Sequence, residues 1–145
     1  MTIESQVASL ELCQKLKELG YPQESLFCWV PNPPSYVESY RLRSMAERGT
    51  YGRDVYISAP TVAELGEMLP WKIEKLWTSP NKTEIRDWYL DIYKHDFEKR
   101  VGDTNKWNVV YSSNQINFIH LADQTEANTR AKMVIYLLEN KFVTL

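Results

Sequence analysis

Apolar side chains recur at helical spacing between residues 10 and 19. Ser9, just before this segment, is a residue type favoured at helix N-caps, and Gly20 followed by Pro22 is a strong helix stop. The pattern therefore predicts a short amphipathic helix with one buried face. That face is formed by Leu12, Cys13, Leu16 and Leu19.

The segment "APTVAELGEMLP" predicts a second, shorter helix. Thr61 and Glu64 have the spacing of a capping box, in which each side chain accepts a backbone N–H of the other residue. Pro70 ends the segment because it cannot continue a helix. The short apolar face consists of Val62, Leu65, Met68 and Leu69.

A third helical pattern follows residue 122. Asp123 and Glu126 repeat the capping-box spacing, so we predict that the helix starts at Asp123, a cap worth about 1 kcal/mol. Asn140 can adopt the left-handed conformation that ends a helix, with Phe142 packing back on the final turn. The apolar stripe consists of Ala127, Ala131, Val134, Ile135 and Leu138.

Segments rich in β-branched and aromatic residues predict strands between these helices. They are residues 25–30, 54–59, 72–77 and 85–93, and the segments "KWNVVYS" and "QINFIHLA", which flank "SN" as a hairpin. Residues 35–53 fit a capped helix or an amphipathic strand, and we favour a strand followed by a loop. We expect a turn at residues 102–105, "GDTN".

The order helix, strands, helix, strands, helix predicts an α+β fold. We expect an antiparallel sheet of about four to six strands with about three helices, mostly on one face. The chain has 145 residues, of which 43% are hydrophobic, and this composition predicts one domain spanning residues 1–145.

Charge and apolar runs exclude several classes of partner. The formal net charge of −2 gives the chain no pull toward duplex nucleic acid on its own. The longest apolar runs, such as residues 133–138, are too short to cross a membrane, and residues 1–12 show no secretory signal. Cys13 and Cys28 have no metal-binding spacing and are interpreted as reduced core residues, so we expect a cytoplasmic protein.

Three segments together resemble a group of short phage and prophage proteins with no assigned activity. They are "LKELGYPQESLFCWV", with its "GYPQES" turn, "APTVAELGEMLP" and "ADQTEANTRAKMVIYLLEN", and they occur in the order found in that group. Residues 31–53 and 78–108 match the group poorly. The resemblance implies an origin in a phage or prophage and a place in the cytoplasm of the bacterial host. It carries over no catalytic residue.

Motifs for catalysis or metal binding are sparse. His95 and Asp96 form the dipeptide of metal-dependent phosphohydrolases, but such a site needs further histidines and only His120 remains. The sequence lacks G-x-S-x-G, G-x-G-x-x-G and G-K-[ST] motifs. We therefore predict no metal, no cofactor and no catalytic residue, and we favour a protein that is not an enzyme.

His120 and Asp123 have a structural interpretation that competes with a catalytic pair. In "INFIHLA", His120 shares the alternating face of Ile116, Phe118 and Ala122, where a histidine is usually hydrogen-bonded locally. We expect His120 to end a strand and Asp123 to cap the helix that follows.

The segment 36–53 is the candidate ligand-binding region. Guanidinium groups bind phosphates and tyrosines stack on bases, so the segment could hold an anionic ligand such as a nucleotide. The alternative, which we favour, is a solvated loop with local ion pairs. The candidate residues are Tyr36, Tyr40, Arg41, Arg43, Arg48, Tyr51 and Arg53.

These observations favour a non-catalytic binding or interaction module that engages a host protein or a small anionic ligand. One alternative is an enzyme acting on nucleotides or phosphoesters through His95, Asp96 and the arginines. Another is a structural or replication-associated phage component. Met133, Tyr136 and Leu137 lie off the main apolar stripe of the third helix, so we also expect a homodimer through these residues.

Overall fold

The structure, a computed structural model, describes residues 2–32, 39–47, 49, 52, 55–94 and 106–145. Three α-helices lie within these residues: α1 (Leu10–Glu18), α2 (Val62–Met68) and α3 (Glu126–Glu139). The strands are β1 (Phe27–Pro31), β2 (Tyr40–Ser44), β3 (Ile57–Ala59), β4 (Lys72–Ser79), β5 (Lys82–Lys94), β6 (Trp107–Ser113) and β7 (Ile116–Asp123). Short 3-10 turns span Ile3–Ser5 and Met45–Glu47.

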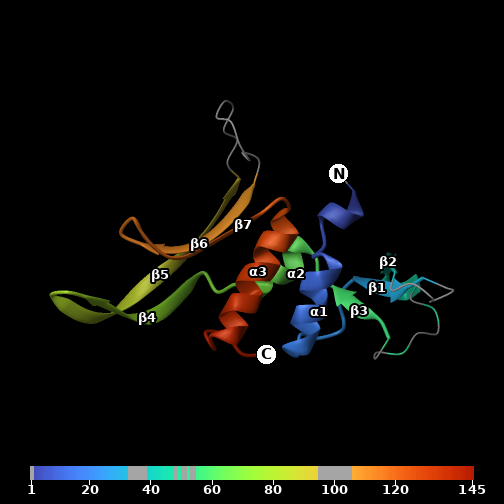
Figure 1. Cartoon of the computed structure of the whole chain (residues 1–145), viewed down its shortest axis with the longest axis horizontal. Helices are drawn as coiled ribbons and strands as arrows, with labels where there is room; N and C mark the ends of the chain where they lie inside the picture. The colour runs from blue at the N-terminus through green and yellow to red at the C-terminus, as the bar shows by residue number, and fades with distance from the viewer. Residues whose placement is uncertain (1, 33–38, 48, 50–51, 53–54, 95–105) are drawn as a thin grey trace.

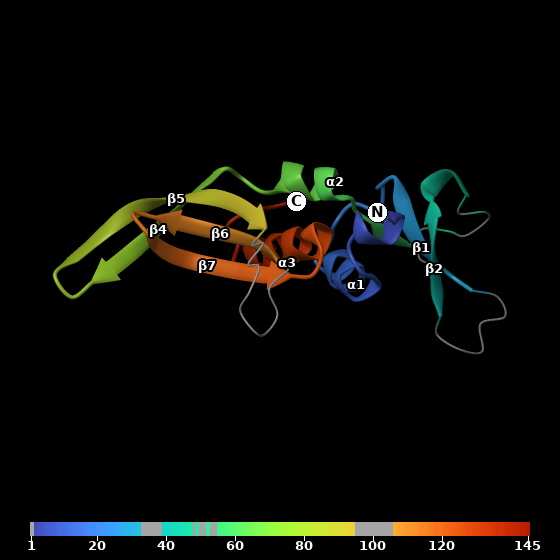
Figure 2. The same cartoon turned by 90° about the horizontal axis from the view of Figure 1, so that it is seen from above.

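The strands form two antiparallel sheets with the helices between them (Figure 1). One sheet has the order β2-β1-β3, and the other has the order β4-β5-β6-β7. Figure 2 shows the four-stranded sheet beside α3 and the three-stranded sheet beyond α1. The predicted α+β class is confirmed. The strands divide between two sheets because the helices present apolar surface on two sides, and each sheet covers one of them.

Helix α1 ends as the sequence predicts. Gly20 has a φ of +89°, and the N–H of Tyr21 donates to the carbonyl of Leu16 at 2.9 Å, which is the pattern of a glycine-terminated helix. Ser9 is the N-cap residue, but its side chain makes no capping bond. Its backbone N–H instead donates to Asn128 Oδ1 at 2.9 Å, so this contact joins α1 to α3.

The capping box of α2 is confirmed. The N–H of Glu64 donates to Thr61 Oγ1 at 3.3 Å, and the N–H of Thr61 donates to Glu64 Oε2 at 2.7 Å. Leu65 is fully buried. The capping box therefore fixes the start of this short helix, and the buried side chain of Leu65 attaches it to the core.

The predicted start of α3 at Asp123 is wrong. Asp123 is the last residue of β7, and the N-cap is Thr125, whose Oγ1 accepts the N–H of Asn128 at 3.2 Å. Asp123 Oδ1 instead accepts the N–H of Gln124, and its Oδ2 pairs with Lys132 Nζ at 2.5 Å. The Asp123–Glu126 spacing is that of a capping box, but Thr125 lies only two residues later and caps the same helix end.

The end of α3 differs from its prediction by one residue. Lys141, with a φ of +58°, takes the left-handed conformation in place of Asn140. The N–H of Phe142 then donates to the carbonyl of Leu137 at 2.8 Å. The ring of Phe142 stacks near that of Tyr136, so the predicted packing on the final turn is confirmed.

Helix α3 is covered by the chain itself on more than one side. Met133 and Leu137 are fully buried in the main core, and Tyr136 packs at its edge. Met133 and Leu137 therefore present no exposed surface to a second copy, whereas Tyr136 is half-buried, and a homodimer stays a prediction. Packing within one chain explains the second apolar side of the helix, because α3 contacts four elements: α1, α2, β6 and β7.

The three-stranded sheet contains part of the ambiguous segment. Residues 40–44 form a strand, as we favoured, and Tyr40 pairs with Pro31 and Leu42 with Trp29. One face of this sheet packs on the main core. On the opposite face, Cys28, Val30 and Tyr56 form a small buried cluster.

The four-stranded sheet is built from consecutive hairpins. Asn114 and Gln115, with φ values of 48° and 65°, form the turn between β6 and β7, one residue later than the predicted "SN". An irregularity next to this turn leaves Phe118 as an extra residue, because Tyr111 pairs with Ile119 and Ser112 with Asn117.

The core draws on the three helices and both sheets. It includes Leu16, Leu65 and Leu137 from the helices, Ile57 from the small sheet and Trp88 from the large one. Among the described residues, no helix is long and apolar enough to cross a membrane.

Candidate functional site

The predicted ligand-binding residues do not form one described cluster. Tyr36, Arg48, Tyr51 and Arg53 lie outside the described residues. Arg41 and Arg43 are exposed on one face of β2, opposite Val30 and Cys28. Tyr40 lies on the other face and packs on the main core. The alternation of the strand therefore separates Tyr40 from the arginines, and an anion site in this segment stays a prediction.

Two carboxylates lie beside Arg43, which borders a hollow at this sheet. Arg43 lines a cavity of about 260 Å³ together with Glu4 and Glu47. Two carboxylates beside one guanidinium give this hollow no excess positive charge for a phosphate. The solvated loop with local ion pairs that we favour for this segment stays a prediction.

The two histidines offer no described catalytic pair. His95 and Asp96 lie outside the described residues. His120 is exposed, and its Nε2 lies 2.8 Å from Asn108 Oδ1, so the predicted local hydrogen bond is confirmed. The irregularity at Phe118 turns His120 to the outer face of the sheet, away from the helices. Asp123 points to the opposite face because it lies three positions after His120 along the strand.

The cysteines are core residues, as predicted. Cys13 and Cys28 are both buried and free. Burial raises the pKa of the Cys13 thiol to about 12, although a hydrogen bond with Trp29 opposes the shift. A thiol with so high a pKa is a poor nucleophile. Among the described residues, no group of three or more His, Cys, Asp or Glu side chains is placed to hold a metal ion.

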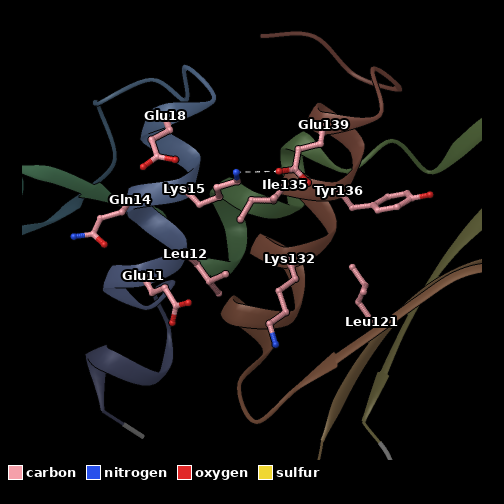
Figure 3. Close-up of a pocket in the computed structure, with 10 residues that line it drawn as sticks. All are labelled: Glu11, Leu12, Gln14, Lys15, Glu18, Leu121, Lys132, Ile135, Tyr136 and Glu139. Carbon is pink, nitrogen blue, oxygen red and sulfur yellow. Dashed lines mark ion pairs between the residues drawn. The ribbon is translucent and has the colours of Figure 1, made fainter.

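A larger hollow lies between α1 and α3 (Figure 3). Its volume is about 520 Å³. Leu121 from β7 joins residues of the two helices in lining it, and the Lys15–Glu139 ion pair of 3.1 Å crosses from one helix to the other. This hollow, the α1–α3 groove, is lined by Glu11, Leu12, Gln14, Lys15, Glu18, Leu121, Lys132, Ile135, Tyr136 and Glu139.

The groove holds charged groups but no described catalytic arrangement. Lys15 pairs with Glu139, and Lys132 pairs with Asp123. Burial opposes ionisation of Asp123, but Lys132 and the N–H of Gln124 outweigh it and lower the pKa of this carboxyl. The two ammonium groups are therefore held by carboxylates. The arrangement suits binding better than proton transfer.

A second candidate surface is the outer face of the four-stranded sheet, which faces away from α3. We call it the open sheet face. Strand register places Leu76 directly opposite Ile85 there, and Lys72 opposite Tyr89. The Trp71 ring reaches this face and lies 5.8 Å from that of Tyr89. Four large side chains on it are exposed: Trp71 (70%), Leu76 (61%), Ile85 (73%) and Tyr89 (46%).

Carboxylates lie among these apolar side chains. Lys72 Nζ lies 3.3 Å from both Glu74 Oε1 and Asp87 Oδ2. The hydrogen bond to Asp87 raises the pKa of Lys72 most, and the hydrogen bond to Glu74 raises it further. Asp91 lies two residues after Tyr89 on the same face of β5; it is exposed and pairs with Val110 of β6. The carboxylates of Glu74, Asp87 and Asp91 against the ammonium of Lys72 give these four residues a formal charge of −2.

The open sheet face was not predicted, although the sequence contains a signal for it. Strand 72–77 carries apolar residues in both alternating phases, with Ile73 and Trp77 in one and Leu76 in the other. A strand with apolar side chains on both faces either has both faces covered by other elements or leaves one apolar face exposed. Only the structure shows that helices cover one side of this sheet.

Comparison with protein-family models, with curated proteins and with solved structures found no match to this chain.

Proposed function

We propose that this protein is a non-catalytic interaction module that binds a basic protein partner through its open sheet face. The observation that carries the proposal is the group of four exposed apolar side chains on that face, of which Ile85 is 73% exposed. Large apolar side chains that gather on one face commonly mark an interaction site.

The arrangement of these side chains supports one continuous contact. Leu76 and Ile85 are cross-strand partners, so their side chains stand next to each other on the β4–β5 hairpin. Trp71 and Tyr89 form a second apolar group nearer the body of the molecule. Aromatic residues of this kind contribute much of the binding energy in protein interfaces.

The charge of the face supports a basic partner. An arginine of the partner could stack on Trp71 or Tyr89 and pair with the exposed carboxylate of Asp91. A nucleic acid would bring phosphates against three carboxylates. A second copy of this chain would bring the same carboxylates against themselves, so the charge pattern favours a different protein.

Site-specific photo-crosslinking in bacterial cells that express the protein tests this proposal. Benzoyl-phenylalanine is placed at Ile85, and the matched control carries it at Leu26, which is 67% exposed and lies near the three-stranded sheet. We expect a discrete adduct only from position 85, with a contact peptide rich in arginine or lysine. The double substitution Asp87→Lys and Asp91→Lys should remove the adduct without changing the far-ultraviolet circular dichroism.

Three results would contradict the proposal. Equal adducts from positions 85 and 26 would show nonspecific contact, and an adduct between two copies of this chain would make the face a dimer interface. An adduct that survives the charge reversal would show that the partner is not recognised by its basic residues.

We also propose, on the resemblance of three sequence segments alone, that the protein is an accessory protein of a phage or prophage. The genes that flank its own in bacterial genomes test this. Phage structural or replication genes beside it would support the proposal, and a consistently unrelated neighbourhood would refute it.

A further inference from the structure

We propose that the α1–α3 groove binds a small amphiphilic organic cation, an alkyl or aryl amine. This site lies between the helices and is independent of the open sheet face, so the two proposals can fail separately. The inference rests on the size of the groove, on its apolar floor and on the unequal charge at its rim.

The size and floor of the groove fit a small apolar group. Its volume of about 520 Å³ falls within the range of small-molecule sites. Leu12, Leu121 and Ile135 supply aliphatic surface, and Tyr136 also lines the groove, although Figure 3 shows its ring pointing away from α1. Helix α1, with nine residues, is about 14 Å long, so the groove suits a short chain better than a long docked helix.

The charges favour a cation at one end of the groove. Figure 3 shows that α1 and α3 run in the same direction, with Glu18 and Glu139 near the ends of their helices. The negative ends of two helix dipoles therefore lie beside two carboxylates, an arrangement that costs stability. The last turn of α3 contains no basic residue, whereas that of α1 contains Lys15 and Lys17, and Lys17 Nζ donates to the carbonyl of Tyr56 at 2.9 Å.

Lys15 occupies the place that we assign to the amine of the ligand. Its Nζ lies 3.1 Å from Glu139 Oε1, and both side chains are more than two-fifths exposed. Exposed ion pairs of this kind contribute little stability, so a ligand ammonium can replace Lys15 at Glu139. Glu11 and Glu18 form no ion pair with the residues that the structure describes, and both remain free to attract a cation.

Titration of the isotopically labelled full chain by heteronuclear magnetic resonance tests the site. The probes are octylamine and octanoate, which share an alkyl chain and differ in charge near neutral pH. We expect octylamine to shift the amide signals of groove-lining residues at millimolar concentration. Octanoate should leave them unchanged.

Two substitutions with opposite effects sharpen the test. Glu18→Gln should weaken octylamine binding by roughly two- to fivefold and should not lower the melting temperature, because it removes a carboxylate from the negative end of α1. Lys15→Gln should strengthen binding by a similar factor, because it removes the competing ammonium.

The proposal fails if octanoate binds as well as octylamine, because the groove would then be merely apolar. It also fails if octylamine shifts no groove signal, or if Lys15→Gln leaves its affinity unchanged. Loss of the folded spectrum in a variant is detected in the same experiment, and Glu18→Gln, at an exposed position, then serves as the deciding variant.

Discussion

At the scale of single residues, the joint between β7 and α3 assigns separate roles to neighbouring side chains. Thr125 accepts the N–H of Asn128 and caps the helix. Asp123 binds the side chain of Lys132, and its Oδ1 accepts from Asn128 Nδ2 at 3.4 Å. Asn128 Oδ1 in turn accepts the N–H of Ser9. The joint therefore connects the sheet, α3 and the start of α1 through one amide side chain.

Substitutions at the two positions should separate these roles. Thr125→Ala should lower the free energy of unfolding by about 1 kcal/mol, and Thr125→Ser should be close to neutral because it keeps the capping hydroxyl. Asp123→Ser should cost about as much as Asp123→Ala, since a hydroxyl cannot pair with Lys132. Urea unfolding of the four variants measures the effects. A stable Asp123→Ser beside a destabilised Asp123→Ala would restore Asp123 as the cap.

At the scale of elements, the β4–β5 hairpin extends well beyond α3 (Figure 1). Its inner face is held by cations on aromatic rings: Arg86 lies 3.8 Å from the ring centre of Trp77, and Lys75 lies 3.9 Å from that of Phe118. Arg86 Nη2 also pairs with Glu84 at 2.7 Å. These contacts tie the hairpin to its own ring at Trp77 and to Phe118 of β7.

Removal of one ring should loosen the hairpin without unfolding the protein. Trp77→Leu deletes the cation–π contact, and we expect amide hydrogen exchange in residues 74–86 to rise roughly two- to fivefold. Exchange in β6 should stay unchanged. The control is Leu76→Thr, which alters the neighbouring residue on the opposite face of the hairpin. An equal rise in both variants would show that the ring contact contributes nothing specific.

The predictions that held at this scale rest on short-range signals. The Thr61–Glu64 box and the stop at Gly20 are local, because the interacting groups lie within a few residues of each other. The division into two sheets and the burial of Leu137 depend on which distant elements meet. The outward position of His120 depends on one extra residue at Phe118, which no alternation pattern reveals.

At the scale of the whole molecule, α3 contributes to a core that reaches both sheets. Leu137 and Met133 belong to the same cluster as Ile57 of the small sheet and Trp88 of the large one. Two sheets that share one core should lose their structure together. The molecule is therefore expected to unfold as one cooperative unit.

Leu137→Ala tests this unity. The substitution should lower the free energy of unfolding by about 2–5 kcal/mol, because it opens a cavity at a fully buried position. Tryptophan fluorescence and far-ultraviolet circular dichroism should report the same urea midpoint. Leu26→Ala, at an exposed position, should change that midpoint little. Separate midpoints for the two signals would show that the sheets unfold independently.

The position of α3 between the sheets also sets the timing of folding during synthesis. The strands β1 to β7 that the structure describes leave the ribosome before α3 does, because α3 follows β7 in the sequence. The hairpins can pair early, since their contacts are local, but the inner face of the four-stranded sheet lacks α3 until residue 137 has emerged. The nascent chain therefore depends on prompt docking of α3, or on chaperones that hold it, to avoid aggregation.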